Sequence, residues 1–147
     1  MTADVRAADV RTADVRTADV SAAVAGLIVW LETGAAPEDV FAPDCFVDLS
    51  LPHWRLQADT REDLFRIRRE SHPFPGRVRV ERVDHTDGGF VIAFEERWED
   101  GQAWYCREQI RADVVDGRIT EVAVYCTGDW DEAVQARHAD EVPLLRA

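Results

Sequence analysis

Apolar and polar positions follow two different periods along this chain. From Ser21 onward the apolar residues recur at the i, i+3, i+4, i+7 spacing that places them on one face of a helix. These residues are Val24, Leu27, Ile28 and Leu31. Gly34 follows directly, as expected of a residue that ends a helix. The pattern therefore predicts an amphipathic helix that ends before Gly34.

Three shorter segments also have helical features. Thr60 and Asp63 resemble a capping box, so a second long helix is expected to begin there and to end before Pro73. A short helical turn is expected over 37–41, because proline suits a first helical position. Thr127 or Asp129 can cap a last helix that runs through Arg137.

The remaining elements alternate with the period of two that is typical of strands. Strands are expected over 45–51, 78–83, 90–98, 104–114 and 119–126. Helix, strand, helix and then an antiparallel meander is the order of an α+β fold with helices on one face of the sheet. We therefore expect one small α+β domain whose curved, mostly antiparallel sheet wraps around helices and an internal apolar pocket.

The first twenty residues form a pentapeptide repeat, TADVR-AADVR-TADVR-TADV. Its valines advance by about 500° per repeat on a helix, so they do not line up as one apolar stripe. Residues 1–20 are therefore expected to be either a low-complexity tail or an outward extension of the first helix. Residues 21–147 are expected to form the domain, because 147 residues is the common size for one core.

Charge argues against two classes of partner. The formal net charge is −12 and the arginines are scattered among acidic residues, so neither nucleic acid nor an anionic membrane is an expected partner. All 17 basic residues are arginine, which favours a GC-rich bacterial source. The longest apolar run is too short to span a bilayer and lacks the basic segment of a signal peptide, so a cytoplasmic location is expected.

The three cysteines, Cys45, Cys106 and Cys126, lack C-x-x-C spacing. No metal site and no disulfide scaffold is expected from this spacing, and the thiols are expected to be reduced.

Three stretches carry a family resemblance over about residues 21–138: GLIVWLETGAAPEDVFAPDCFVDLSLP, RADVVDGRITEVAVYC and the long penultimate strands. They resemble the nuclear transport factor 2-like superfamily, which includes ketosteroid isomerases, SnoaL-like polyketide cyclases and epoxide hydrolases. It implies a cone-shaped α+β barrel around a pocket, and a homodimer formed through the outer sheet face.

Hairpin register decides which side chains share a face of the sheet. A three-residue loop of residues 99–101 pairs Trp98 with Gln102, and the same reasoning at residues 115–117 pairs Glu108 with Val124 and Cys106 with Cys126. The inner face then consists of Phe90, Ile92, Phe94, Glu96, Trp98, Trp104, Cys106, Glu108, Ile110, Val122, Val124 and Cys126.

Two carboxylates on this otherwise apolar face require an explanation, because burying an unpaired charge is costly. Glu108 is the leading candidate for acid/base chemistry, since apolar neighbours raise a carboxyl pKa; the alternative is a structural ion pair with a helix arginine. Glu96 is a weaker candidate. His53 and Trp54 follow the first strand, where relatives line the pocket mouth, and His53 is expected to assist Glu108; the alternative is an ordinary surface loop.

The resemblance places the general-base position of ketosteroid isomerases near Leu49, with Asp48 adjacent, so Asp48 is the third catalytic candidate. Which face of this strand is inner remains open. The two donor positions fall near Leu27 and Ile110, and the histidine and aspartate of SnoaL-like cyclases fall at Val122 and Val124, so neither set is present.

Two functions fit this pattern. The first is a cofactor-independent enzyme of cyclase, isomerase or dehydratase type that acts by general acid/base catalysis on an apolar or aromatic small molecule. Bacterial secondary metabolism is one setting in which such an enzyme is expected. The second is a noncatalytic ligand-binding or accessory dimerisation protein. The residues expected to contact the ligand are Trp30, Trp54, Phe94, Glu96, Trp98, Trp104, Cys106, Ile110, Val124 and Cys126.

Overall fold

Three helices and six strands make up the protein. The computed structural model describes residues 2–146, with side chains described from residue 17 onward. In chain order the elements are α1 (Thr2–Thr33), β1 (Phe41–Leu51), β2 (Trp54–Ala58), α2 (Arg61–Ser71), β3 (Gly76–His85), β4 (Gly89–Glu99), β5 (Ala103–Val115), β6 (Arg118–Cys126) and α3 (Glu132–Glu141).

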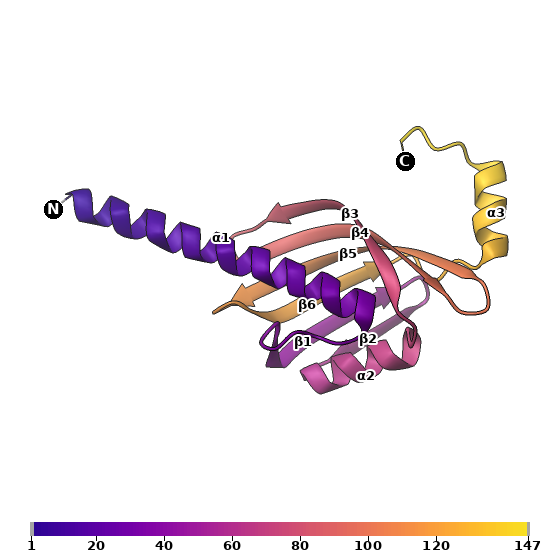
Figure 1. Ribbon diagram of the computed structural model, residues 1–147, viewed down its shortest axis with the longest axis horizontal. Helices are drawn as coiled ribbons and strands as arrows, with labels where there is room; N and C mark the ends of the chain where they lie inside the picture. The colour runs from indigo at the N-terminus through magenta and orange to yellow at the C-terminus, as the bar shows by residue number, and fades with distance from the viewer. Residues whose placement is uncertain (1, 147) are drawn as a thin grey trace.

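The strands form one six-stranded sheet in the order β2-β1-β6-β5-β4-β3. All neighbours are antiparallel except β1 and β6, the second and third strands in this order, which run parallel. Helix α1 crosses one face of the curved sheet, α2 lies at the β1–β2 edge, and α3 lies beyond the strand ends, next to the turn of the β4–β5 hairpin (Figure 1). The α+β class expected from the element order, with a curved sheet around helices, is therefore confirmed.

Helix α1 packs through the face that the apolar spacing indicated. Leu27, Trp30 and Leu31 are buried in the core, and Ala23 continues the same face one turn earlier. The helix ends at Gly34, which has a φ of 76° and donates its N–H to the carbonyl of Trp30 at 2.7 Å. Glycine adopts this left-handed conformation without a Cβ penalty. Because α1 begins at Thr2, the backbone of the repeat is continuous with this helix.

The register of the β4–β5 hairpin was predicted wrongly by two residues. Trp98 pairs with Trp104, and the loop consists of residues 100–102 rather than 99–101. A shift of two leaves every side chain on its face, because the side-chain period of a strand is also two. The inner face is therefore composed as expected, but Phe94 lies opposite Glu108 instead of Cys106.

The β5–β6 register also differs by two residues. Asp116 and Gly117, both with positive φ, form a two-residue turn, and an irregularity between Asp113 and Val114 restores the parity of the pairing. Glu108 lies opposite Cys126, so Cys106 and Cys126 are diagonal and not direct neighbours.

Strand β2 was not expected. The segment after β1, read as a loop, is a tight hairpin in which Leu51 pairs with Trp54, so His53 lies in the two-residue turn.

Two other local expectations were wrong. Residues 37–40 form a turn instead of a helical turn, with Asp39 at a φ of 66°, and Phe41 already begins β1. The cap of α3 is Asp131, whose carboxylate accepts the N–H of Val134 at 2.8 Å. The cap of α2 is Thr60, as expected.

None of the helices in residues 2–146 combines the length and apolar character needed to cross a bilayer.

Candidate functional site

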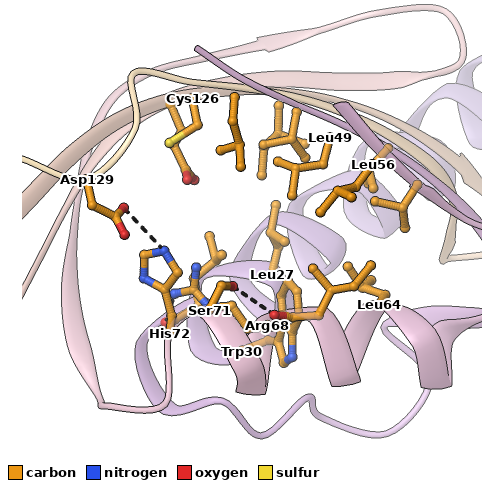
Figure 2. A pocket seen from close by; sticks show the side chains of 18 of the residues that line it. Leu27, Trp30, Leu49, Leu56, Leu64, Arg68, Ser71, His72, Cys126 and Asp129 are labelled. Carbon is orange, nitrogen blue, oxygen red and sulfur yellow. Dashed lines mark hydrogen bonds and ion pairs between the residues drawn. The ribbon is translucent and has the colours of Figure 1, made fainter. Parts of the chain in front are cut away.

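A cavity of about 280 Å³ lies between α1, α2 and the inner face of the sheet. Most of its wall is apolar, with leucines from α1, α2, β1 and β2 (Figure 2). The apolar lining residues are Leu27, Trp30, Leu31, Phe41, Val47, Leu49, Leu51, Pro52, Leu56, Leu64, Ile67, Ile110, Val122 and Val124. Such a wall favours an apolar or aromatic guest.

Polar groups gather at one end of this cavity. Arg68, Ser71, His72, Cys126 and Asp129 lie there, away from Leu56 and Leu64 (Figure 2), and Glu108 also lines the cavity. These groups come from α2, β5, β6 and the segment after β6, so the fold alone brings them together.

Arg68 and Glu96 form a buried, two-pronged ion pair. The two guanidinium nitrogens of Arg68 donate to the two carboxylate oxygens of Glu96 at 2.5 and 3.1 Å. Arg68 also donates to the carbonyl of Leu31 at 2.8 Å and lies over the ring of Trp30. Glu96 is only 4% exposed, and this pairing satisfies its charge. The structural alternative considered for Glu108 thus applies to Glu96.

Glu108 occupies a different environment, although it is also buried, at 9% exposure. Burial raises the pKa of Glu108 well above its ordinary value, and the negative charge of Glu96 raises it further. Both causes favour the protonated carboxyl over the carboxylate. Glu108 can therefore donate a proton into the cavity that it lines.

Two thiols lie beside this carboxyl. Cys106 Sγ is 3.7 Å from Glu108 Oε1 and 3.8 Å from Glu96 Oε2. A hydrogen bond from Cys106, supported by the Gly128 N–H at 3.3 Å, lowers the pKa of Cys126 to about 7. The same Cys106–Cys126 hydrogen bond raises the pKa of Cys106, as does burial. Cys126 is therefore the more acidic thiol and also the one that lines the cavity.

His72 and Asp129 form the other polar pair. His72 Nε2 lies 3.5 Å from Asp129 Oδ1, as the dashed line in Figure 2 shows, and the imidazole packs on the ring of Trp98 at 4.4 Å. Burial lowers the pKa of His72, and the positive charge of Arg68 lowers it further. Burial raises the pKa of Asp129. A neutral imidazole next to a carboxylate is an arrangement that can accept a proton.

Five of the residues proposed from the sequence line the cavity. They are Trp30, Glu108, Ile110, Val124 and Cys126.

Five others from the inner face lie next to the cavity without lining it. Phe94, Glu96 and Cys106 are buried in the sheet behind it. Trp98 and Trp104 stack with nearly parallel rings 6.3 Å apart, and Trp98 supports His72. The indole N–H of Trp104 is buried without a hydrogen-bond partner among the described residues.

His53, Trp54 and Asp48 lie outside the cavity. His53 is exposed in the β1–β2 turn, and Trp54 is 67% exposed. Asp48 points away from the inner face, which Val47 and Leu49 occupy, and it pairs with Arg55 at 2.5 Å. This answers the open question about β1: from Cys45 onward its odd-numbered residues face inward.

Sequence reasoning missed Arg68, Ser71, His72 and Asp129. Arg68 and Ser71 follow Leu64 at the i+4 and i+7 spacing of the buried helix face, a signal that was available. His72 directly follows α2. It caps α2 at its C-terminal end, where it donates its N–H to the Arg68 carbonyl, but its side chain turns into the cavity.

The fold is that of the nuclear transport factor 2-like superfamily, as the sequence resemblance implied. No protein-family model matches the sequence, and neither does any curated protein.

The similarity of fold comes from comparison with solved structures. A protein of this fold from Anabaena variabilis has a TM-score of 0.64 at 16% identity, over 78% of this chain and 90% of that one. One of unknown function from Burkholderia xenovorans has a TM-score of 0.60 at 15% identity, over 89% and 98%. IdmH from Streptomyces antibioticus, described as a candidate polyketide cyclase, has a TM-score of 0.58 at 17% identity, over 73% and 91%.

Proposed function

We propose that this protein is a cofactor-independent enzyme that transfers protons on an apolar or aromatic small molecule, as cyclases, isomerases and dehydratases do. The observation that carries the proposal is the buried carboxyl of Glu108 at the wall of an apolar cavity, where burial raises its pKa well above the ordinary value. Arg68 pairs with Glu96, so Glu108 retains its raised pKa. Burying a carboxyl group lowers the stability of the fold. Groups with strongly shifted pKa values are concentrated at functional sites, which supports a catalytic role for Glu108.

In this proposal Glu108 is the general acid. It donates its proton to a carbonyl oxygen or to a leaving hydroxyl group of the bound molecule. His72 replaces His53 as the second catalytic group, because His72 lines the cavity and His53 does not. The neutral imidazole of His72 takes a proton from carbon, and Asp129 stabilises the imidazolium that forms. The apolar wall excludes water, which strengthens both interactions.

Deuterium exchange tests this chemistry before any natural substrate is known. A ketone probe such as α-tetralone is incubated with the protein in D₂O, and NMR follows deuterium incorporation next to the carbonyl. The wild-type protein is expected to accelerate exchange. Glu108→Gln and His72→Phe are each expected to reduce the acceleration about 100-fold or more, in line with the usual contribution of a general acid or base.

The matched control is Glu121→Gln, which makes the same change on β6 at a partly exposed carboxylate paired with Arg111. It is expected to exchange at the wild-type rate. Binding of the probe is measured separately through quenching of Trp30, which lines the cavity. If Glu108→Gln binds the probe and exchanges it as fast as the wild type, the assigned acid is wrong.

A noncatalytic ligand-binding protein is the second candidate, and the apolar wall favours it. Leu27 and Ile110, which the resemblance aligned with the donor positions of ketosteroid isomerases, both line the cavity and carry no polar group. Tight binding of several apolar probes without any accelerated exchange would support this function against the enzymatic one.

A homodimer through the outer sheet face is also proposed. That face carries a ladder of ion pairs and polar contacts, including Arg107 with Glu81 and Arg79 with Glu95, beside the 63%-exposed Tyr125. Sedimentation velocity is expected to give twice the mass of 16.6 kDa. A monomer at micromolar concentration would contradict the proposal.

A further inference from the structure

Two thiols and one carboxyl group converge at the polar end of the cavity. Glu108 on β5 pairs directly with Cys126 on β6, and Cys106 lies two residues before Glu108 on the same face. One donor atom from each residue lies within 4.8 Å of the other two. The three side chains therefore form a compact triangle on two adjacent strands.

The spacing of this triangle matches the coordination geometry of zinc. With Zn–S bonds of about 2.3 Å and Zn–O bonds of about 2.0 Å, tetrahedral ligand atoms lie roughly 3.5–3.8 Å apart. Cys106 Sγ and Glu108 Oε1 are already 3.7 Å apart. Since the other separations are at most 4.8 Å, they need to shrink by no more than about 1.3 Å, which side-chain rotation can supply.

The surroundings also suit a bound cation. The Gly128 N–H donates to Cys126 Sγ, the kind of outer interaction that orients a thiolate ligand. Cys106 is fully buried, whereas Glu108 and Cys126 line the cavity, so the open side of the triangle faces the space where a small molecule would bind. Three protein ligands and one open position are typical of zinc sites that do chemistry.

We propose that Cys106, Glu108 and Cys126 bind a thiophilic divalent cation of the zinc class, with the fourth coordination position open to the cavity. Two sulfur ligands exclude a preference for magnesium or calcium, which select oxygen. The diagonal placement of the cysteines also favours a shared metal over a disulfide, because diagonal pairs lie farther apart than directly opposed residues.

This inference does not depend on the proposed function. A metal would use the lone pair that the Glu108 proton occupies, so zinc is expected to suppress the deuterium exchange that Glu108 supports. If the chelated protein accelerates deuterium exchange but the metal-free protein does not bind added metal, only the metal site is overturned. Metal binding without any exchange in the chelated protein would overturn the proposed function alone.

The test is a titration of the full-length protein, reduced and metal-free, with Cd²⁺ and separately with Zn²⁺. Cd²⁺ is expected to bind one equivalent and to produce ultraviolet thiolate-to-metal charge-transfer absorption from two sulfur atoms. Calorimetry with Zn²⁺ is expected to give the same stoichiometry. Cys106→Ser, Cys126→Ser and Glu108→Gln are each expected to weaken zinc binding at least tenfold.

Cys45→Ser is the matched control, since Cys45 is a buried thiol on β1 outside the triangle. It is expected to bind both metals as the wild type does. If a cysteine variant fails to fold, the ¹¹³Cd NMR shift of the wild-type protein reports the number of sulfur ligands directly. Absence of charge-transfer absorption, a shift that indicates fewer than two sulfurs, or loss of binding in Cys45→Ser would overturn the site.

Discussion

Replacing Arg68 with methionine removes the only cation that the structure pairs with buried Glu96 among the described residues. Methionine keeps most of the side-chain volume but cannot satisfy the carboxylate, which is 4% exposed. Two charge-assisted hydrogen bonds to Glu96 and one to the Leu31 carbonyl are lost together. Leaving one partner of a buried ion pair alone costs about 3–5 kcal/mol. That is a large share of the roughly 5–15 kcal/mol that stabilises a typical domain.

Urea unfolding followed by circular dichroism measures this loss. Arg66→Met is the control, because Arg66 lies on the same helix, is half exposed and makes only ion pairs at 3.4 and 3.5 Å. Its free energy of unfolding is expected to change by less than about 1 kcal/mol. The double variant Arg68→Met/Glu96→Leu is expected to recover most of the stability, because no buried charge is left without a partner. If Arg68→Met is as stable as the control, the pair does not satisfy Glu96 as described.

Three further predictions concern the cavity. The pKa of Glu108 is raised in the folded state, so its contribution to stability is complete below the unfolded-state pKa of about 4.5 and is lost as the pH rises through the folded-state pKa. Glu108→Gln should therefore gain stability relative to the wild type above pH 4.5, as measured by melting temperature. Iodoacetamide should alkylate Cys126 with a midpoint near pH 7 by mass spectrometry, whereas Cys45, buried with a pKa raised to about 12, should stay unmodified at that pH. Val124→Phe should fill the cavity and weaken binding of α-tetralone about tenfold or more, while the free energy of unfolding changes by less than about 2 kcal/mol; unchanged affinity would mean that the probe binds elsewhere.

The division of side chains between the faces of the sheet could be read from the sequence. Alternation along β4 and β5 identified Phe94, Glu96, Cys106 and Glu108 as inward-facing, and the two-residue error in register left that set unchanged. The helical period likewise identified Leu27 as buried. These properties are local, since each depends only on the geometry of its own strand or helix.

The partners of those inward-facing groups could not be read in the same way. Which glutamate pairs with Arg68 depends on where the packing of α2 places this side chain relative to Glu96 on β4, 28 residues further along the chain. The difference between Glu96 and Glu108 follows from that one contact. Local sequence patterns do not predict this contact, because it depends on the packing of elements that are distant in the sequence.

The position of the histidines was decided in the same manner. The sequence predicted His53 at the pocket mouth, but the two-residue turn between β1 and β2 directs this side chain to solvent. His72 had no role in the sequence-based site, but the end of α2 places it against Trp98 and Asp129 at the cavity wall. The sequence by itself determined which residues face inward, since that depends on backbone period. Only the tertiary structure decided which of them meet, because burial, charge pairing and the resulting pKa values arise from groups that are far apart in the chain.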